Sequence, residues 1–289
     1  MTVSAHIPVL LEEVASFLVS EKTEIFVDAT VGGAGHSAFI LEKYKNLKII
    51  GLDADEKALE IAGKNLAAFK DRATLVRGNF KDLKEILKER EITSINGILF
   101  DLGLSTYQIF GERGFSFNDD AFLDMRMDNR QPLTAYDVVN GYNYDDLKAV
   151  VEEYGEEYRA RMIAKAIVDE RKKRPITTAK ELSSVIMKAK RRTGKIHPAT
   201  KTFQAIRVEV NGELKNLSAG IEGAIDMLAP HGRIGVISFH SLEDRMVKNV
   251  FKNNQLLNII TKKPFKAGRS EVLDNPNSRS AKLRVAEKK

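Results

Sequence analysis

The chain has 289 residues, of which 43% are hydrophobic and 30% are charged, and it contains no cysteine. This composition predicts a soluble protein with a core large enough for one large or two modest domains. The missing cysteines exclude disulfides, thiolate metal sites and a cysteine nucleophile, and they suit a reducing cytosol. No apolar run approaches the ~18 residues of a transmembrane helix and we see no signal peptide, so a membrane partner is not expected.

The net charge of +6 is spread unevenly along the chain. Residues 119–158 hold eleven acidic and three basic side chains. Residues 159–195 hold thirteen basic and three acidic ones, and residues 262–289 hold nine basic and three acidic ones. Each basic block is either a solvated face or a surface for a polyanionic partner, most simply nucleic acid.

The first third of the chain alternates short apolar runs with helical patterns. Strands are predicted at 25–28, 48–53, 73–76 and 95–101, and helices at about 10–19, 36–45, 56–69 and 83–87. Such β-α alternation predicts a parallel sheet with helices on both of its faces.

The alternation stops between residues 108 and 199, where helices are predicted near 145–153, 157–173 and 178–190, the last capped by Thr178. A long helix over about 200–229 follows, with an apolar core stripe and with Arg207 and Asn211 on a polar side that faces RNA or solvent. Strands are then predicted at 233–239, 256–260 and 281–285, the last a half-exposed, antiparallel edge strand. We therefore expect an α/β fold in three segments, with a helical substrate-recognition insertion at 108–199 between the two parts of a sheet domain, 1–107 and 200–289.

A glycine-rich turn, D-A-T-V-G-G-A-G-H-S, follows the first strand over residues 28–37. Gly32, Gly33 and Gly35 tolerate positive φ angles and allow a ligand to approach the backbone closely. The helix after the turn directs its first N–H groups toward the same space. A strand, a glycine-rich turn and a helix in this order predict a nucleotide-type site.

The acidic residues at the strand ends separate two nucleotide classes. Residues 33–38 fit the dinucleotide pattern G-x-G-x-x-[G/A], and Asp53 lies 20 residues beyond Gly33. Asp28, however, would repel the phosphates of a dinucleotide such as NAD. S-Adenosylmethionine has no phosphate, and its ammonium and sulfonium groups are cationic, so acids beside the turn favour it.

In this interpretation Asp53 accepts hydrogen bonds from the ribose hydroxyls, Phe80 lies against the adenine, and Asp101 ends the fourth strand next to the methyl group. Three acids at successive strand ends would share the carboxyl edge of the sheet, where open α/β sheets bind ligands. Seven strands with an antiparallel last strand are expected of a Rossmann-like S-adenosylmethionine-dependent methyltransferase sheet. A phosphate-binding P-loop is excluded because no G-K-[S/T] follows the turn.

Eight strings, in order from end to end, resemble one family. They are HIPVL (6–10), DATVGGAGHS (28–37), DLGLS (101–105), RGFSF (113–117), LDMRMD (123–128), HPATKTFQAIR (197–207), ISFHSLEDR (237–245) and NPNSRSAKLR (275–284). The chain is similar in these strings to the MraW-type bacterial small-subunit (16S) ribosomal RNA cytosine-N4 methyltransferases, the methyltransferase H family. The strings at 123–128 and 237–245 are far more specific than the glycine turn.

The resemblance implies methyl transfer from S-adenosylmethionine to the exocyclic N4 of a cytidine in the decoding region of the small ribosomal subunit. It also implies that the cofactor is held at the positions matching Ala34, Gly35, His36, Asp53, Phe80, Asp101 and Gln108. Many members have a glycine where this chain has Ala34, and one methyl group is tolerated there if φ is negative. The Thr106-Tyr107 pair replaces a common Ser-Pro and leaves the backbone before Gln108 less constrained.

The absence of cysteine bears on the chemistry, since methylation of cytosine at C5 typically needs a cysteine that adds to the ring. The remaining mechanism is direct attack on the methyl group by an exocyclic nitrogen or a hydroxyl. The N4 amine is a poor nucleophile and needs an acceptor for its N–H, for which Asp101 is our candidate catalytic residue. The platform for the base is Tyr107, Phe115 or Phe117.

Several assignments stay open at this point. His240 is either an active-site group or a strand-end histidine bonded to backbone, and His197 is a helix lead-in rather than a ligand. No metal cluster is visible and none is expected. The resemblance implies small-subunit ribosomal RNA as the partner, naked or in the assembled subunit, and an oligomer is possible. The alternatives are an NAD-dependent oxidoreductase and a non-catalytic RNA-binding protein with a vestigial cofactor site.

Overall fold

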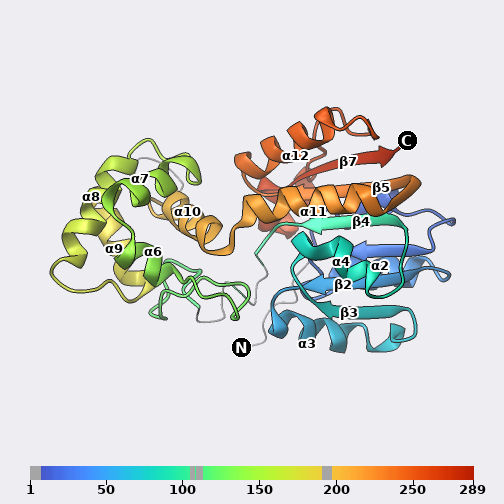
Figure 1. Cartoon of the computed structure of the whole chain (residues 1–289), viewed down its shortest axis with the longest axis horizontal. Helices are drawn as coiled ribbons and strands as arrows, with labels where there is room; N and C mark the ends of the chain where they lie inside the picture. Colours follow the sequence, from blue (N-terminus) through green and yellow to red (C-terminus); the bar gives the residue numbers. More distant parts are fainter. Residues whose placement is uncertain (1–7, 105–107, 109–112, 191–196) are drawn as a thin grey trace. The chain divides into compact units, whose positions relative to one another are not determined.

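The computed structural model describes residues 8–104, 108, 113–190 and 197–289. The chain divides into two units (Figure 1). The sheet unit comprises Met1–Ser105 and Leu214–Lys289, and the helical unit comprises Thr106–Glu213. The helical unit is thus inserted into the sheet unit. It extends beyond the expected 108–199 segment because α10 (Thr200–Asn211) belongs to it.

The sheet unit is built on seven strands, as predicted. They are β1 (Ile25–Asp28), β2 (Lys48–Asp53), β3 (Ala73–Arg77), β4 (Ile95–Asp101), β5 (Leu228–Ser238), β6 (Leu257–Ile259) and β7 (Lys282–Lys288). Their order is β3-β2-β1-β4-β5-β7-β6. Strands β1 to β5 run parallel, whereas β7 is antiparallel to both β5 and β6. This mixed sheet is of the S-adenosylmethionine-dependent methyltransferase type.

The last strand is antiparallel, as predicted, but the prediction that it lies at the edge of the sheet is wrong. β7 lies between β5 and β6, and Val285 and Ala286 are fully buried. The period-two pattern was misleading because Arg284, which reads as a solvent-facing residue, is only 7% exposed. Its Nε donates to Asp244 Oδ1 over 2.7 Å. The edge strand on this side is β6.

Helices cover both faces of the sheet, as the alternation predicted. One layer holds α1 (Leu11–Leu18), α2 (Gly35–Lys43) and α3 (Glu56–Asn65), and the other holds α4 (Leu83–Lys88), α11 (Glu213–Met227) and α12 (Ser241–Asn253). Side chains of successive residues in a strand point to opposite faces of the sheet. Phe26 therefore packs with α1 and α2, whereas Val27 packs with α4 and α11. The shorter helices are η1 (Ala67–Phe69), η2 (Phe80–Asp82), α13 (Arg269–Asp274) and η3 (Pro276–Ser280).

The helical unit contains α6 (Ala135–Gly141), α7 (Tyr144–Glu153), α8 (Ala160–Arg171), α9 (Ala179–Ala189) and α10. Thr178 caps α9 as predicted, in a capping box with Glu181. The helix α6 was not predicted, although Thr134 and Asp137 form the same box at its start. None of the helices in the described part of the chain combines the length and apolar character needed to cross a bilayer.

The single helix predicted over 200–229 is in fact two helices. α10 ends at Asn211, and Gly212 takes φ 59° and ψ 32°, the left-handed conformation that favours glycine after a helix. α11 then begins at Glu213. The apolar stripe continues across this break, which is why the pattern indicated one helix.

Candidate active site

Three acidic side chains lie at the carboxyl ends of neighbouring strands, as the sequence predicted. Asp28 ends β1, Asp53 ends β2 and Asp101 ends β4. Because β1 lies between β2 and β4 and is parallel to both, the three residues share one edge of the sheet. This carboxyl edge is where open α/β sheets bind their ligands.

The turn after β1 uses its small residues differently from our expectation. Gly32 has a φ of +50°, but the second left-handed residue is Ala34, with φ 63°, at the N-cap of α2. The condition of a negative φ at Ala34 is therefore not met, and its methyl group costs roughly 1–2 kcal/mol. Gly35 is needed for packing, since a Cβ there would lie 2.3 Å from Pro8 Cγ.

Asp53 ties the end of β2 to the glycine turn. Its Oδ2 accepts from the Gly32 N–H and its Oδ1 from the Asp55 N–H, both over 2.9 Å. Burial raises the pKa of Asp53 to about 6, against the opposing effect of these two hydrogen bonds. A buried carboxylate of this kind gains from further donors, such as the hydroxyls of a ribose.

Asp28 is 2% exposed and accepts a 2.6 Å hydrogen bond from Ser37 Oγ. Burial raises the pKa of Asp28, and the Ser37 hydrogen bond offsets this only in part. On the neighbouring strand, the Asp101 N–H donates to Thr30 Oγ1 over 2.7 Å. Sequence reasoning missed the roles of Thr30 and Ser37, although small hydroxyl residues between a strand and a helix are a usable signal.

His36 lies between these elements and is 6% exposed. Its Nε2 is 2.9 Å from the Val9 carbonyl oxygen, which can only accept, so Nε2 carries the proton. Burial lowers the pKa of His36 and favours the neutral ring. Nδ1 then presents a lone pair at 3.8 Å from Asp101 Oδ2. Two acceptors that face one another suit a cationic or hydrogen-donating group near them.

Phe80 is the first residue of η2, directly after β3, and is half-buried. Its ring meets Phe100 edge to face at 5.6 Å between centroids. α11 passes close to it at Gly220, where a Cβ would lie 2.8 Å from the Phe80 ring. Phe80 is therefore held in place after the third strand, and its contact with an adenine stays a prediction. Gln108 is buried, but it belongs to the helical unit and not to the sheet unit that brings the other predicted residues together.

The chemistry of this edge fits S-adenosylmethionine better than a dinucleotide. Three carboxyl groups surround the turn, and they favour a ligand with cationic groups and hydroxyl donors over one with two phosphates. The Gly32 N–H, which a phosphate would use, is donated to Asp53. The Ala34 N–H is donated to the Val31 carbonyl over 2.6 Å.

The string at 237–245 forms the N-terminal cap of α12. Glu243, 2% exposed, accepts from the Phe239 N–H (2.8 Å) and the His240 N–H (3.3 Å), and its other oxygen is 2.9 Å from His240 Nε2. His240 Nδ1 accepts from the Glu243 N–H over 3.4 Å. The His240 ring thus contacts both the Glu243 carboxylate and a backbone N–H, and its role as an active-site group stays a prediction.

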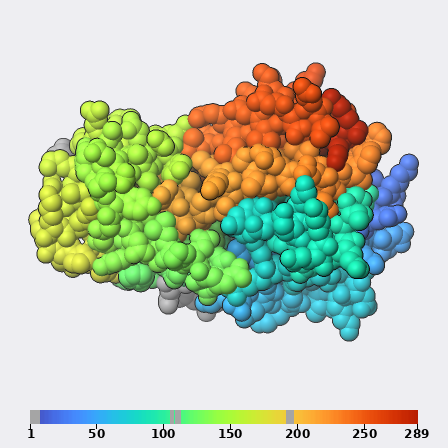
Figure 2. All heavy atoms as spheres, in the orientation of Figure 1, coloured from blue at the N-terminus to red at the C-terminus, as the bar shows by residue number. Residues whose placement is uncertain are grey.

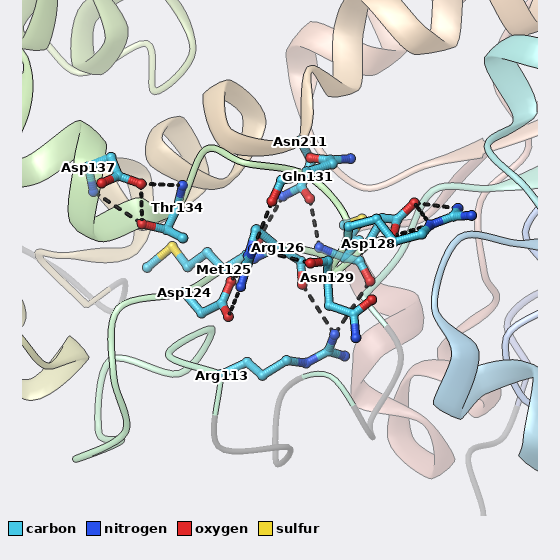
Figure 3. A network of polar contacts seen from close by, with 12 residues as sticks. Arg113, Asp124, Met125, Arg126, Asp128, Asn129, Gln131, Thr134, Asp137 and Asn211 are labelled. Carbon is cyan, nitrogen blue, oxygen red and sulfur yellow. Dashed lines mark hydrogen bonds and ion pairs between the residues drawn. The ribbon is translucent and has the colours of Figure 1, made fainter.

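The string at 123–128 is the centre of a polar network within the helical unit (Figure 3). Arg126 donates to Asp124 through Nε (2.6 Å) and Nη2 (3.0 Å), and its Nη1 donates to the Gln131 carbonyl (2.7 Å). Arg113 Nη1 donates to the Arg126 carbonyl over 3.2 Å. Met125, at the centre, has a φ of 54° and is 1% exposed. This specific string therefore determines the conformation of a loop.

The expectation that Arg207 and Asn211 face RNA or solvent is wrong. Asn211 is 5% exposed; it accepts from the Met127 N–H (2.7 Å) and donates to the Met125 carbonyl (2.8 Å). The Arg207 guanidinium donates to both oxygens of Glu213, over 2.7 and 2.9 Å. Both residues bind α10 to other parts of the helical unit, since the hydrogen-bond partners of each belong to that unit.

Two of the aromatic candidates for a base platform have partners within the helical unit. Phe115 is 8% exposed and lies under the Arg113 guanidinium at 5.6 Å. Phe117 stacks on His197 with 4.2 Å between ring centroids. His197 also leads into α10 as expected, its Nδ1 accepting from the Ala199 N–H. Tyr107 and its neighbour Thr106 lie outside the described residues.

Basic residues of the block at 159–195 form ion pairs with acidic residues of the helical unit. Examples are Lys165 with Asp169 (2.8 Å), Lys173 with Glu170 (2.9 Å), Arg174 with Glu181 (2.9 Å) and Lys180 with Asp120 (3.0 Å). Exposed pairs of this kind contribute little to stability, but they reduce the positive field that a polyanion would meet.

Comparison with known proteins gives a match over almost the whole chain. The model of a family described as the MraW methylase family matches residues 3–289. A protein named ribosomal RNA small subunit methyltransferase H from Sulfurihydrogenibium sp. (strain YO3AOP1) is 54% identical over 286 residues, which are 97% of this chain and 98% of that protein. One of the same name from Persephonella marina is 50% identical over 289 residues, 98% of this chain and 99% of its own.

Among solved structures, an rRNA methylase from Streptococcus thermophilus is similar with a TM-score of 0.46 and 13% sequence identity. The similarity covers 96% of this chain and 93% of that one.

Proposed function

This chain belongs to the MraW methylase family, a family of S-adenosylmethionine-dependent methyltransferases, and we propose that it methylates the exocyclic N4 of a cytidine in the decoding region of small-subunit ribosomal RNA. The observation that carries the choice of cofactor is the group of three carboxyl side chains at the ends of β1, β2 and β4. The close relatives are named as enzymes of the small subunit, which supports the choice of substrate.

Each residue of the edge has a defined task in this proposal. Asp53 accepts the ribose hydroxyls, and Phe80 contacts the adenine. The backbone of Ala34, Gly35 and His36 forms the wall of the turn, and the family resemblance adds Gln108 to the residues expected to contact the cofactor. His36 Nδ1 and Asp101 Oδ2, which lie 3.8 Å apart, would accept from the cationic end of the cofactor. Bound S-adenosylmethionine supplies a methyl group on a positively charged sulfur.

Asp101 has a second task, as the acceptor for the amine that is methylated. The N4 lone pair is delocalised into the cytosine ring, so the amine gains nucleophilicity when an N–H hydrogen bond is accepted as positive charge develops. Asp101 lies at the end of the central strand β4, with its backbone fixed by Thr30. The protein thus orients the amine and removes its proton, and it has no cysteine to attack C5.

The target cytidine has to leave its stack to reach an atom inside a pocket. Basic surface on the protein supports the binding of the surrounding phosphates, with an affinity that falls steeply with salt. We place this reaction in the cytosol, on either naked RNA or the assembled subunit.

The test is a labelled-methyl transfer assay with small subunits that lack the modification, followed by nucleoside analysis. We expect N4-methylcytidine as the product; 5-methylcytidine or a 2′-O-methyl nucleoside would refute the assignment. Titration with S-adenosylmethionine and with NAD separates the remaining alternatives, since an oxidoreductase binds NAD and a non-catalytic RNA-binding protein shows no saturable binding of the methyl donor.

Asp101→Asn tests the acceptor role in the same assay. We expect kcat to fall by roughly 100-fold or more at saturating cofactor, because a general base contributes about 10²–10⁴. The matched control is Asp71→Asn, an exposed aspartate of the sheet unit, which should keep full activity. Full turnover with unchanged cofactor affinity in Asp101→Asn would remove Asp101 from this role.

A further inference from the structure

A hollow of about 300 Å³ lies between α12 and the two last strands of the sheet unit. It is lined by Lys248, Phe251, Lys252, Ile259, Thr261, Lys262 and Arg284. We call it the β6 groove. α12 and the chain that follows it form the orange-red part of the surface in Figure 2. The volume is at the lower end of the range of small-ligand sites, which begins near 300 Å³.

The β6 groove is separate from the strand-end acids. α12 begins at Ser241, directly after the carboxyl end of β5, and runs back along the sheet to Asn253. Lys252 is eleven residues beyond Ser241, about 16 Å along the helix axis at 1.5 Å per residue. A ligand in the groove therefore contacts surface that the cofactor does not use.

The charge of the groove is positive and largely uncompensated. Four of its seven lining residues are basic and none is acidic. Arg284 is paired with Asp244, whose pKa is lowered: burial raises it, but the hydrogen bonds to Arg284 and Lys282 outweigh burial. Lys248, Lys252 and Lys262 are exposed, and none of them has an acidic partner within salt-bridge distance in the described part of the chain. Lys165 of α8 and Lys180 of α9, by contrast, have such partners.

Apolar surface accompanies these lysines. Phe251 is 2% exposed and closes the floor, while Ile259 is 41% exposed at the edge strand. Ile260, next in the chain, is 39% exposed. Cationic heads beside an apolar floor match a nucleotide unit, in which phosphates alternate with sugars and flat bases.

The spacing of the lysines also fits a polynucleotide. Lys248 and Lys252 are one helical turn apart on α12, roughly 5–6 Å between their Cβ atoms, so each can meet a different phosphate. Lys262 belongs to the chain after β6 and supplies charge from a separate element. A strand that enters the groove is thus contacted by both elements.

We propose that the β6 groove binds the sugar-phosphate backbone of the RNA substrate, at nucleotides other than the one that is methylated. This inference rests on the proposed function, because the substrate supplies the polyanion. It assigns a second RNA contact to the sheet unit, away from the strand-end acids.

The first test is the variant Lys248→Gln/Lys252→Gln/Lys262→Gln, assayed with small subunits and with a transcript of the decoding region. We expect KM for the subunits to rise about tenfold, with kcat and the affinity for S-adenosylmethionine unchanged. Binding of the transcript should lose roughly 0.7 in salt slope for each phosphate contact that is removed.

The matched control is Lys64→Gln/Lys70→Gln/Lys88→Gln, which removes the same charge from exposed lysines elsewhere on the sheet unit. Equal losses in both triple variants would mean that only net charge matters, and would overturn the proposal. So would an unchanged KM and salt slope in the groove variant. If wild-type protein does not methylate the subunits at all, the proposed function fails, and this is measured before either variant is compared.

The second test uses the absence of cysteine, which makes single-site labelling clean. Lys252→Cys and, as a control, Lys70→Cys are coupled to a photoreactive reagent and irradiated with the transcript. We expect RNA cross-links from position 252 that map to nucleotides away from the modified cytidine. Cross-links of equal yield from position 70, or only to the modified cytidine, would contradict the groove assignment.

Discussion

The carboxylates at the carboxyl edge of the sheet and those of the 123–131 loop are used in opposite ways. In the loop, Asp124 and Asp128 each bind an arginine, Arg126 and Arg130, with distances down to 2.6 Å. At the sheet edge, neither Asp28 nor Asp53 has a lysine or arginine within salt-bridge distance among the described residues, and burial raises the pKa of both.

The difference shows which acids are available for a ligand. A carboxylate whose oxygens accept hydrogen bonds from a guanidinium stabilises the local fold and has little capacity left to accept hydrogen bonds from a ligand. A buried carboxylate held only by N–H and hydroxyl donors is destabilised in its ionised form, and it gains when a cation or further donors arrive. Asp28 and Asp124 both lie in strings that indicate the family, but of the two regions only the sheet edge has the electrostatics of a binding site.

The largest effect is expected at Asp53. Asp53→Asn should weaken the binding of S-adenosylmethionine by roughly 100-fold, about 2.7 kcal/mol, because hydrogen bonds to a charged acceptor are lost. In the wild type, the ligand's hydroxyls favour the ionised carboxylate, and the pKa of Asp53 in the free protein is about 6. Affinity should therefore be constant above pH 7 and should fall as the pH drops below 6.

Calorimetric titration of the cofactor between pH 5 and 8 measures both effects. The Asn variant should lose the pH dependence, whereas Asp71→Asn should keep the wild-type profile. A pH-independent wild-type affinity over this window would contradict the assigned role of the Asp53 carboxylate.

A smaller effect, of the opposite kind, is expected in the loop. Asp124→Asn should destabilise the helical unit by about 2 kcal/mol, since it breaks a half-buried bidentate pair with Arg126. The affinity for S-adenosylmethionine should stay within about twofold. Hydrogen exchange of the amides in α6 to α10 measures the local stability, which a whole-chain melting curve would not separate.

Asp120→Asn is the control for this change. Its carboxylate is 73% exposed and pairs with Lys180, so the cost should not exceed about 0.5 kcal/mol. If both variants lose the same stability, the distinction between the loop network and an ordinary surface pair is lost.

The smallest effect concerns the left-handed residue that each region contains. Ala34→Gly should change the free energy of unfolding by less than about 1 kcal/mol, because the relief of strain at φ 63° is offset by the entropy added to the unfolded chain and by the loss of a buried methyl group (Ala34 is 0% exposed). Met125→Gly relieves similar strain but should destabilise, since Met125 is 1% exposed and its burial is worth about 1.5–3 kcal/mol. Thermal unfolding of the two variants measures both changes, and a loss in Ala34→Gly as large as that in Met125→Gly would contradict the strain assigned to Ala34.

The features that could be predicted from sequence are those set by neighbouring residues. An apolar run that ends in aspartate indicates a strand and its carboxyl end together, so Asp28, Asp53 and Asp101 were correctly brought to one edge. The cap at Thr178 was equally local. The break at Gly212 had a local signal too, the Asn-Gly pair, but the continuing apolar stripe outweighed it.

The features that could not be predicted depend on distant partners. Asn211 binds backbone groups of residues 125 and 127, more than eighty positions earlier, and nothing in its own helix indicates them. The place of β7 inside the sheet depends on strand order, and the burial of Arg284 depends on Asp244 of α12. The positive φ of Ala34 is imposed by the turn, although the residue itself disfavours it.

The inserted position of the helical unit also has a consequence for how the chain is completed during synthesis. Strands β4 and β5 are hydrogen-bonded neighbours, yet about 130 residues separate Asp101 from Leu228. At 5–20 residues per second, roughly 6–26 seconds pass in which the edge of β4 has no strand beside it. The helical unit is made in that interval and is rich in fast-forming local contacts. The nascent chain therefore closes its inserted unit first, and the sheet that carries the cofactor site is completed last.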